Sequence, residues 1–119
     1  MLESLNGLMA AGSWRREGLT IGGVAQELEV PEHRLRRLIN QRLDHRNFAD
    51  FVNSYRIEAA KARLADPQAA RTTVAAIAFE VGYGSLGPFN RAFRLATGNT
   101  PTEWRRQALS HSPDPNEAV

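Results

Sequence analysis

The sequence predicts an all-α protein in which two copies of one two-helix unit stand on either side of a long helix. Residues 47–64, NFADFVNSYRIEAAKARL, contain neither Gly nor Pro, and their apolar residues mostly recur at steps of three and four. This is the pattern of an amphipathic helix, and at about 1.5 Å per residue it is roughly 27 Å long. The stretches before and after it, TIGGVAQELEV and TVAAIAFEVGY, resemble each other, which indicates one supersecondary unit used twice.

The two copies align residue by residue. At an offset of 53 the aligned pairs are Thr20 with Thr73, Ile21 with Val74, Val24 with Ile77, Ala25 with Ala78, Glu27 with Glu80, and Leu28 with Val81. One extra residue changes the offset to 54, which pairs Leu35 with Phe89, Arg37 with Arg91, Leu38 with Ala92, and Ile39 with Phe93. We therefore expect about seven helices in five segments: a leading helix and loop (1–18), a first helix-turn-helix unit (19–46), a linker helix (47–65), a second helix-turn-helix unit with a final helix (66–109), and a disordered tail (110–119).

In the first unit, Thr20 is the expected cap of a helix that ends near Glu29, and a second helix runs from Pro31 to Arg42. At about 100° per residue, the second helix has a core face and a polar face. The core face carries Leu35, Leu38 and Ile39, whereas the polar face carries His33, Arg36, Arg37 and Asn40, with no acid among them. The turn that follows, around Asp44, can adopt a left-handed conformation at modest cost.

The second unit shows the same signals. Thr72 or Thr73 caps the first helix, Gly82 supplies a positive φ for the turn, and Ser85 caps a helix that Gly98 ends. Its core face holds Phe89, Ala92 and Phe93, and its polar face holds Gly87, Asn90, Arg91 and Arg94. Thr100-Pro101-Thr102-Glu103 is a capping box for the final helix, in which we expect Trp104 to point inward and Arg105 and Arg106 outward.

Catalytic and metal sites find no support in the sequence. There is no Cys, the His residues lie in unrelated contexts, and no Gly-rich phosphate loop is present. Asp44-His45 is interpreted as a helix terminus and not as a catalytic dyad. We expect no enzyme activity and no cofactor. No apolar run is long enough for a membrane span, so no membrane contact and a cytoplasmic location are the default expectations.

The charge favours nucleic acid as the partner. All fifteen Lys and Arg, but only ten of the thirteen acids, lie in residues 15–106, which therefore carry a net charge of +5. Fourteen of these cations are Arg, whose planar fork grips phosphate and guanine. Two alternatives stay open: a GC-rich genome that encodes Arg in place of Lys, and a helical module that binds another protein, in which the outward Arg residues are merely solvated.

A helix, a tight turn and a second helix with a basic outer face is the arrangement that places a recognition helix in the DNA major groove. Arg reads guanine and Asn reads adenine. Two such units on a rod of roughly 27 Å would face successive major grooves about 34 Å apart. The shortfall predicts that the DNA bends or that one unit binds loosely.

The segment from Leu19 to Arg106 resembles the DNA-binding domain of AraC/XylS-type transcriptional regulators. The most specific part is GYGSLGPFNRAFRLATGNTPTEWRR, residues 82–106, and Phe48 to Leu64 is similar to the linker helix of that family. The resemblance implies sequence-specific binding of double-stranded DNA for the regulation of transcription. It also suggests two further partners: RNA polymerase, and an N-terminal sensor or dimerisation domain outside this chain. We expect the chain to be a fragment of a longer protein, and a minimal regulator is the alternative.

Carried over by position, the resemblance implies a set of DNA-binding residues. The base-facing positions are His33, Arg36, Arg37, Leu86, Gly87, Pro88 and Arg91, and the backbone or flanking positions are Arg34, Asn40, Arg46, Ser85, Asn90 and Arg94. Gly87 and Pro88 depart from the polar side chains common in the family, so we expect the second unit to read fewer bases directly. Glu29 and Asp44 stand where the family usually has Gly, which is expected to cost some local stability.

Overall fold

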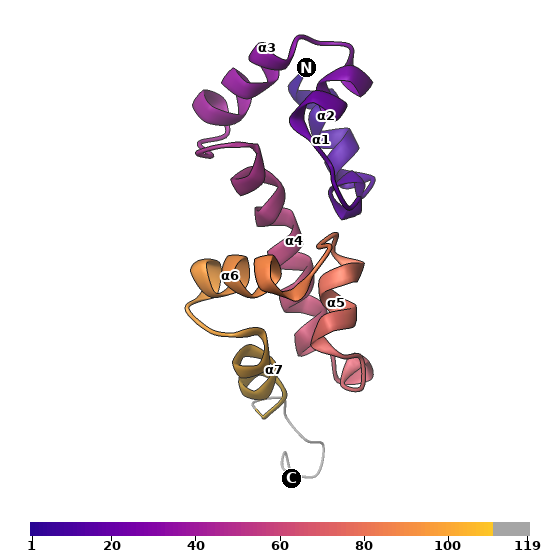
Figure 1. The fold of residues 1–119 in the computed structure, drawn as a ribbon, viewed down its shortest axis with the longest axis vertical. Helices are drawn as coiled ribbons and strands as arrows, with labels where there is room; N and C mark the ends of the chain where they lie inside the picture. The colour runs from indigo at the N-terminus through magenta and orange to yellow at the C-terminus, as the bar shows by residue number, and fades with distance from the viewer. Residues whose placement is uncertain (111–119) are drawn as a thin grey trace.

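The computed structural model describes residues 1–110, and this part is all-helical and elongated, with extents of 57 × 29 × 22 Å (Figure 1). Its seven α-helices are α1 (Leu2–Ala10), α2 (Ile21–Leu28), α3 (Glu32–Arg37), α4 (Phe48–Ala65), α5 (Val74–Glu80), α6 (Leu86–Thr97) and α7 (Pro101–Ser110). Short 3₁₀ turns cover Ser13–Arg15 and Pro67–Ala69. One contiguous hydrophobic core joins both units to α4, so the all-α prediction with about seven helices is confirmed.

The long helix α4 is capped as expected, because Asn47 Oδ1 accepts a hydrogen bond of 2.8 Å from the Asp50 backbone amide. Its burial differs from the single stripe that the sequence predicts. The buried residues of its first half are Phe51 and Val52, and those of its second half are Ile57, Ala60 and Leu64. At about 100° per residue the two sets lie on nearly opposite sides of the helix.

Ala62 belongs to the apolar pattern of residues 47–64 but is exposed. The physical reason is that α4 turns a different face towards each of the two units that share the core. Beyond its midpoint the helix packs against α5, α6 and α7, for example through Trp104, whose indole N–H donates to the Lys61 carbonyl at 3.3 Å. A helix between two units needs an apolar face for each of them, and a one-stripe pattern describes only one.

The helix-turn-helix turns of the two units have the same geometry. In the first, Thr20 Oγ1 caps Gly23 N (3.0 Å), Glu29 adopts a left-handed φ of 56°, and Val30 N donates to Ala25 O at 3.0 Å. The equivalent contacts 53 residues later are Thr73 Oγ1 with Ala76 N (3.0 Å), Gly82 at φ 105°, and Tyr83 N with Ala78 O (3.0 Å). The repeat in sequence is therefore a repeat in structure.

The helix expected from Pro31 to Arg42 is not uniform. It begins as α3 and widens into a π-helical turn over Leu38–Arg42, where Leu43 N donates to Leu38 O at 3.1 Å. Asp44 then takes a left-handed φ of 56° and ends the element. The expected core residues Leu35, Leu38 and Ile39 are all buried.

The end of the chain brings one confirmed cap and two corrections. Thr100 and Glu103 form the capping box, with N–H···O distances of 3.0 and 3.1 Å, and the Thr100 backbone amide lowers the pKa of Glu103. Arg105 turns inward, against expectation, and donates to the carbonyls of Leu64, Ala69 and Thr72 at 3.4, 3.2 and 2.7 Å. Ser110, predicted to open the tail, is the last residue of α7, and the rest of that tail, 111–119, lies outside the described residues.

Candidate nucleic-acid interface

The outer face of α3 is open to solvent. His33, Arg34, Arg36 and Arg37 are all exposed, while Leu35 between them is fully buried. An acid outside the predicted polar set reaches this face: Glu32 Oε1 lies 2.6 Å from Arg36 Nη2, one helical turn away. Both side chains are about half exposed (49% and 53%), and such surface pairs are worth little. Arg36 can therefore exchange Glu32 for a DNA acceptor at small cost.

Asn40 is exposed but has a local role. In the amide orientation that satisfies its hydrogen bonds, its nitrogen donates to the carbonyls of His45 and Arg46 at 3.0 and 3.2 Å. The side chain thus braces the turn between the first recognition helix and α4. This turn is also held by His45, whose Nδ1 lies 2.9 Å from Asp50 Oδ2. The hydrogen bond from His45 is the main reason that the pKa of Asp50 is lowered.

The first unit contains a basic residue that its sequence pattern did not single out. Arg42 lines one shallow hollow together with Arg34, Arg37 and Gln41, at the edge of the recognition helix beside Met1. Steps of three and four residues place positions 34, 37 and 41 along one strip of the helix, and Arg42 follows directly in the π-helical turn. Three guanidinium groups there make a positive edge that is suited to phosphate.

The outer face of α6 is less polar. Leu86 is 39% exposed, Gly87 and Pro88 are exposed, and so are Asn90, Arg91 and Arg94. Ser85 is the N-cap by its extended backbone, but its side chain makes no capping hydrogen bond, so the expected cap is only half right. A Cβ added to Gly87 would lie 3.4 Å from Arg91 Nη1. The Arg91 guanidinium therefore lies back over Gly87, towards the first turn of the helix.

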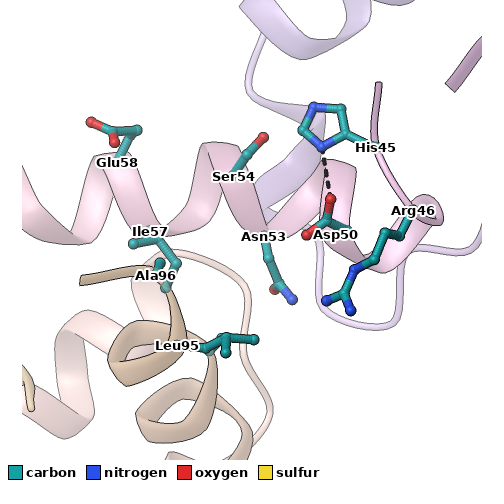
Figure 2. Close-up of a pocket in the computed structure, with 10 residues that line it drawn as sticks. His45, Arg46, Asp50, Asn53, Ser54, Ile57, Glu58, Leu95 and Ala96 are labelled. Atoms are coloured by element: carbon teal, nitrogen blue, oxygen red, sulfur yellow. Dashed lines mark hydrogen bonds and ion pairs between the residues drawn. The ribbon is translucent and has the colours of Figure 1, made fainter. Parts of the chain in front are cut away.

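Between α6 and the first half of α4 lies a groove (Figure 2). Arg46, Asp50 and Asn53 line one wall, and Leu95 and Ala96 of α6 line the other. Leu95 is the most exposed large apolar side chain of the described residues, at 79%. Arg46, a predicted backbone-contact residue, is exposed as well and lines this groove beside α6.

The exposed faces of α3 and α6 are connected through one long helix, α4. α3 and α6 lie on the same side of α4 in the view of Figure 1, while α2 and α5 lie on the other. The eighteen residues of α4 between them correspond to a rod of roughly 27 Å. Within residues 1–110, no group of His, Cys, Asp and Glu side chains is arranged to hold a metal ion. The same residues form no helix both long and apolar enough to cross a bilayer.

Comparisons with known proteins agree with this arrangement. A family model described as a helix-turn-helix domain matches residues 24–107. The C-terminal domain of AraT, a response regulator from Geobacillus stearothermophilus, is 30% identical, with a TM-score of 0.73 over 86% of this chain and 82% of that one. No curated protein sequence matches the chain.

Two more distant structures share the fold. One is a transcriptional regulator with an AraC-type DNA-binding domain from Chromobacterium violaceum (22% identity, TM-score 0.67, 79% and 80% of the two chains). The other is a DNA-binding transcriptional dual regulator from Escherichia coli K-12 (18% identity, TM-score 0.73, 87% and 88%). With its duplicated helix-turn-helix unit and a family match over most of its length, the chain belongs to the AraC-type helix-turn-helix family, whose members are DNA-binding regulators of transcription and not enzymes.

Proposed function

We propose that this chain reads an asymmetric double-stranded DNA site through two boxes, with α3 and the first turns of α6 in successive major grooves. The observation that carries the proposal is the pair of exposed faces, one with Arg36 and Arg37 and one with Arg91, held on the same side of a single helix. Since roughly 27 Å of helix is shorter than the 34 Å between successive grooves, we expect the DNA to bend towards the protein.

In the first unit, we assign base reading to His33, Arg36 and Arg37, because these side chains are exposed and Arg can bind guanine in a bidentate manner. Arg34 and Arg46 are assigned to phosphates. The contribution of Asn40 to backbone contact is indirect, through the turn that it braces.

In the second unit, Leu86, Gly87, Pro88 and Arg91 are the base-facing positions, flanked by Ser85, Asn90 and Arg94. Of the four base-facing positions only Arg91 can donate a hydrogen bond from its side chain. Gly87 has a positive role here, because its missing side chain leaves room for the Arg91 guanidinium near the start of the helix. We propose that this unit reads one or two bases directly and depends more on phosphate contacts and DNA shape.

Selection from random double-stranded DNA at two salt concentrations tests the proposal. We expect one asymmetric motif of two boxes about one helical turn apart, with an affinity that falls steeply as salt rises. If no DNA is retained even at low salt, DNA binding is refuted and the remaining candidate is a helical module that docks a protein on the Arg36–Arg37 face.

The selected site then tests the residue roles. Arg37→Ala should weaken binding by about 1–3 kcal/mol and relax the preference at one base pair. Pro88→Ala is the matched control on the other recognition helix and should change the sequence preference little. An equal loss for Arg37→Ala on the selected site and on random DNA would instead make Arg37 a phosphate contact.

Three finer assignments follow from the family and belong to the same proposal. We propose that the DNA-bound chain acts in the cytoplasm and contacts RNA polymerase, and that an N-terminal sensor or dimerisation domain controls it. Transcription from a promoter that carries the selected site, with purified polymerase and the chain, tests the contact with RNA polymerase. An unchanged transcript level with the site fully occupied would count against it.

A further inference from the structure

The segment that precedes the first helix-turn-helix unit packs on the turn of the second. Trp14, in the 3₁₀ turn after α1, and Tyr83, directly after the left-handed Gly82, are both buried (8% and 7% exposed). A Cβ added to Gly82 would lie only 3.0 Å from the Trp14 carbonyl oxygen and 2.9 Å from that of Arg15. The two backbones are therefore in direct contact, although about seventy residues separate them in the chain.

Arg56, at the middle of α4, ties this contact together. Its Nε donates to the Trp14 carbonyl at 2.7 Å, and its Nη2 donates to the Arg16 carbonyl at 2.9 Å. The guanidinium also lies 5.3 Å from the centre of the Tyr83 ring, within cation–π range. Burial lowers the pKa of Arg56, but an arginine stays protonated at any physiological pH.

Tyr83 is also hydrogen-bonded to α4. Its hydroxyl donates a hydrogen bond to Asn53 Oδ1, one helical turn before Arg56. Burial raises the pKa of Tyr83 to about 12, so the hydroxyl remains a donor. We call the set Trp14, Arg16, Asn53, Arg56 and Tyr83 the Arg56 junction. It joins the leading segment, the linker helix and the second unit by contacts that are independent of the α4 backbone.

Such a junction has a consequence for two-box recognition. One base pair added between the boxes moves the second box by about 3.4 Å and rotates it by about 35° around the DNA axis. A single helix with its neighbours loosely attached can bend and twist to follow part of that change. A helix that is held to the leading segment by the charge-assisted hydrogen bonds of Arg56, and to the second unit by the Tyr83–Asn53 hydrogen bond and the cation–π contact, resists that change.

We propose that Arg56 is the positioning residue that fixes the separation and rotation of α3 relative to α6, and that it thereby sets the DNA spacer length that this protein accepts. This inference rests on the proposed two-box function. Arg56 touches no DNA in this scheme, and its effect is on the geometry of the pair of recognition helices. The affinity of each helix for its own box is unaffected.

The test is a panel of duplexes that carry the two selected boxes with spacers from two base pairs shorter to two base pairs longer. For the unmodified chain we expect each changed base pair to lower the affinity about tenfold or more, since one recognition helix loses its base contacts. Arg56→Ala should bind the best spacer somewhat more weakly and lose about threefold or less per changed base pair, because the second helix can follow its box.

Arg63→Ala is the matched control. Arg63 lies on the same helix and also pairs with the second unit, through two hydrogen bonds of 2.9 and 3.1 Å to the Glu80 carboxylate, but it contributes nothing to the Arg56 junction. We expect its spacer preference to match that of the unmodified chain. If Arg63→Ala and Arg56→Ala relax the preference equally, any perturbation of α4 suffices and the specific role of Arg56 is refuted.

A second experiment measures the distance between the two units in the absence of DNA. The sequence has no Cys, so spin labels on Gln26→Cys in α2 and Thr102→Cys in α7, both exposed, report one distance between the units. Arg56→Ala should broaden that distribution while circular dichroism stays helical. If Arg56→Ala does not fold, Arg56→Lys carries the same test, because Lys keeps the charge near Tyr83 but not the forked pair of donors.

The outcomes separate the two proposals. An unmodified chain that is insensitive to spacer length contradicts two-box binding itself. An unmodified chain that is sensitive, beside a folded Arg56 variant with the same spacer preference and the same sharp distance, overturns only the role of Arg56.

Discussion

Glu29 is strained by its position, and replacing it with Gly should stabilise the protein. Its φ of 56° and ψ of 42° place an L-residue with a full side chain in the left-handed region. The conformation is required because the Glu29 and Val30 amides turn back to the end of α2, with Val30 N donating to Ala25 O at 3.0 Å. This is the helix-ending motif in which Gly is the usual residue.

The magnitude follows from two opposing contributions. A left-handed conformation costs a residue with a Cβ roughly 1–2 kcal/mol. Gly removes that cost but loses more backbone entropy on folding, by roughly 0.5–1 kcal/mol. The net gain for Glu29→Gly in the free energy of unfolding should be about 0.5–1 kcal/mol, which for a domain of this size raises the Tm by about 2–5 °C.

Urea denaturation of three variants measures this effect and isolates its cause. Glu29→Gln keeps the Cβ and removes the charge, so it should be close to the parent protein. Glu29→Asn should be intermediate, because Asn tolerates the left-handed region. Glu29→Gly should have the highest free energy of unfolding with an unchanged m-value. If Gln stabilises as much as Gly, the gain comes from charge, and the strain argument is refuted.

Two further predictions concern the same fold. Gly82 is the position equivalent to Glu29 in the second unit. Gly82→Ala should lower the free energy of unfolding by about 2–3 kcal/mol, because a side chain there is strained at φ 105° and would collide with the Arg15 carbonyl. A neutral result in urea denaturation would contradict the close contact. Arg105→Met should cost about 1–3 kcal/mol, because up to three carbonyls lose their donor, whereas the exposed neighbour Arg106→Met should change stability by less than about 0.5 kcal/mol. Equal effects of the two Met variants would show that Arg105 is not a structural residue.

Local signals made the fold predictable. The apolar residues of α4 mostly recur at steps of three and four. The caps at Thr20 and Thr73 and the Thr100–Glu103 box each join residues three positions apart. Their consequences are therefore visible in a short window of sequence. The offset of 53 residues added the one piece of long-range information, because two copies of a unit must fold alike, and the turns at Glu29 and Gly82 do.

The candidate interface was predictable in part. Exposure of His33, Arg37 and Arg91 opposite a buried strip follows from helical periodicity alone. The pairing of Arg36 with Glu32 follows from four-residue spacing as well, whereas Arg42 is five residues from Arg37, within the π-helical turn. The position of the Arg91 guanidinium over Gly87 does not follow from spacing, because it depends on a rotamer.

The sequence by itself determined which stretches form helices, the caps at Thr20, Asn47, Thr73 and Thr100, and which side of each recognition helix faces outward, because backbone hydrogen bonding and periodicity are local. Only the tertiary structure decided what the long helix does with its two faces, why Arg105 points inward while Arg106 does not, and that Arg56 connects Trp14 to Tyr83. The contacts of Arg56 and Arg105 join residues 27 to 42 positions apart, and no periodicity within one segment specifies which distant carbonyl an arginine will reach.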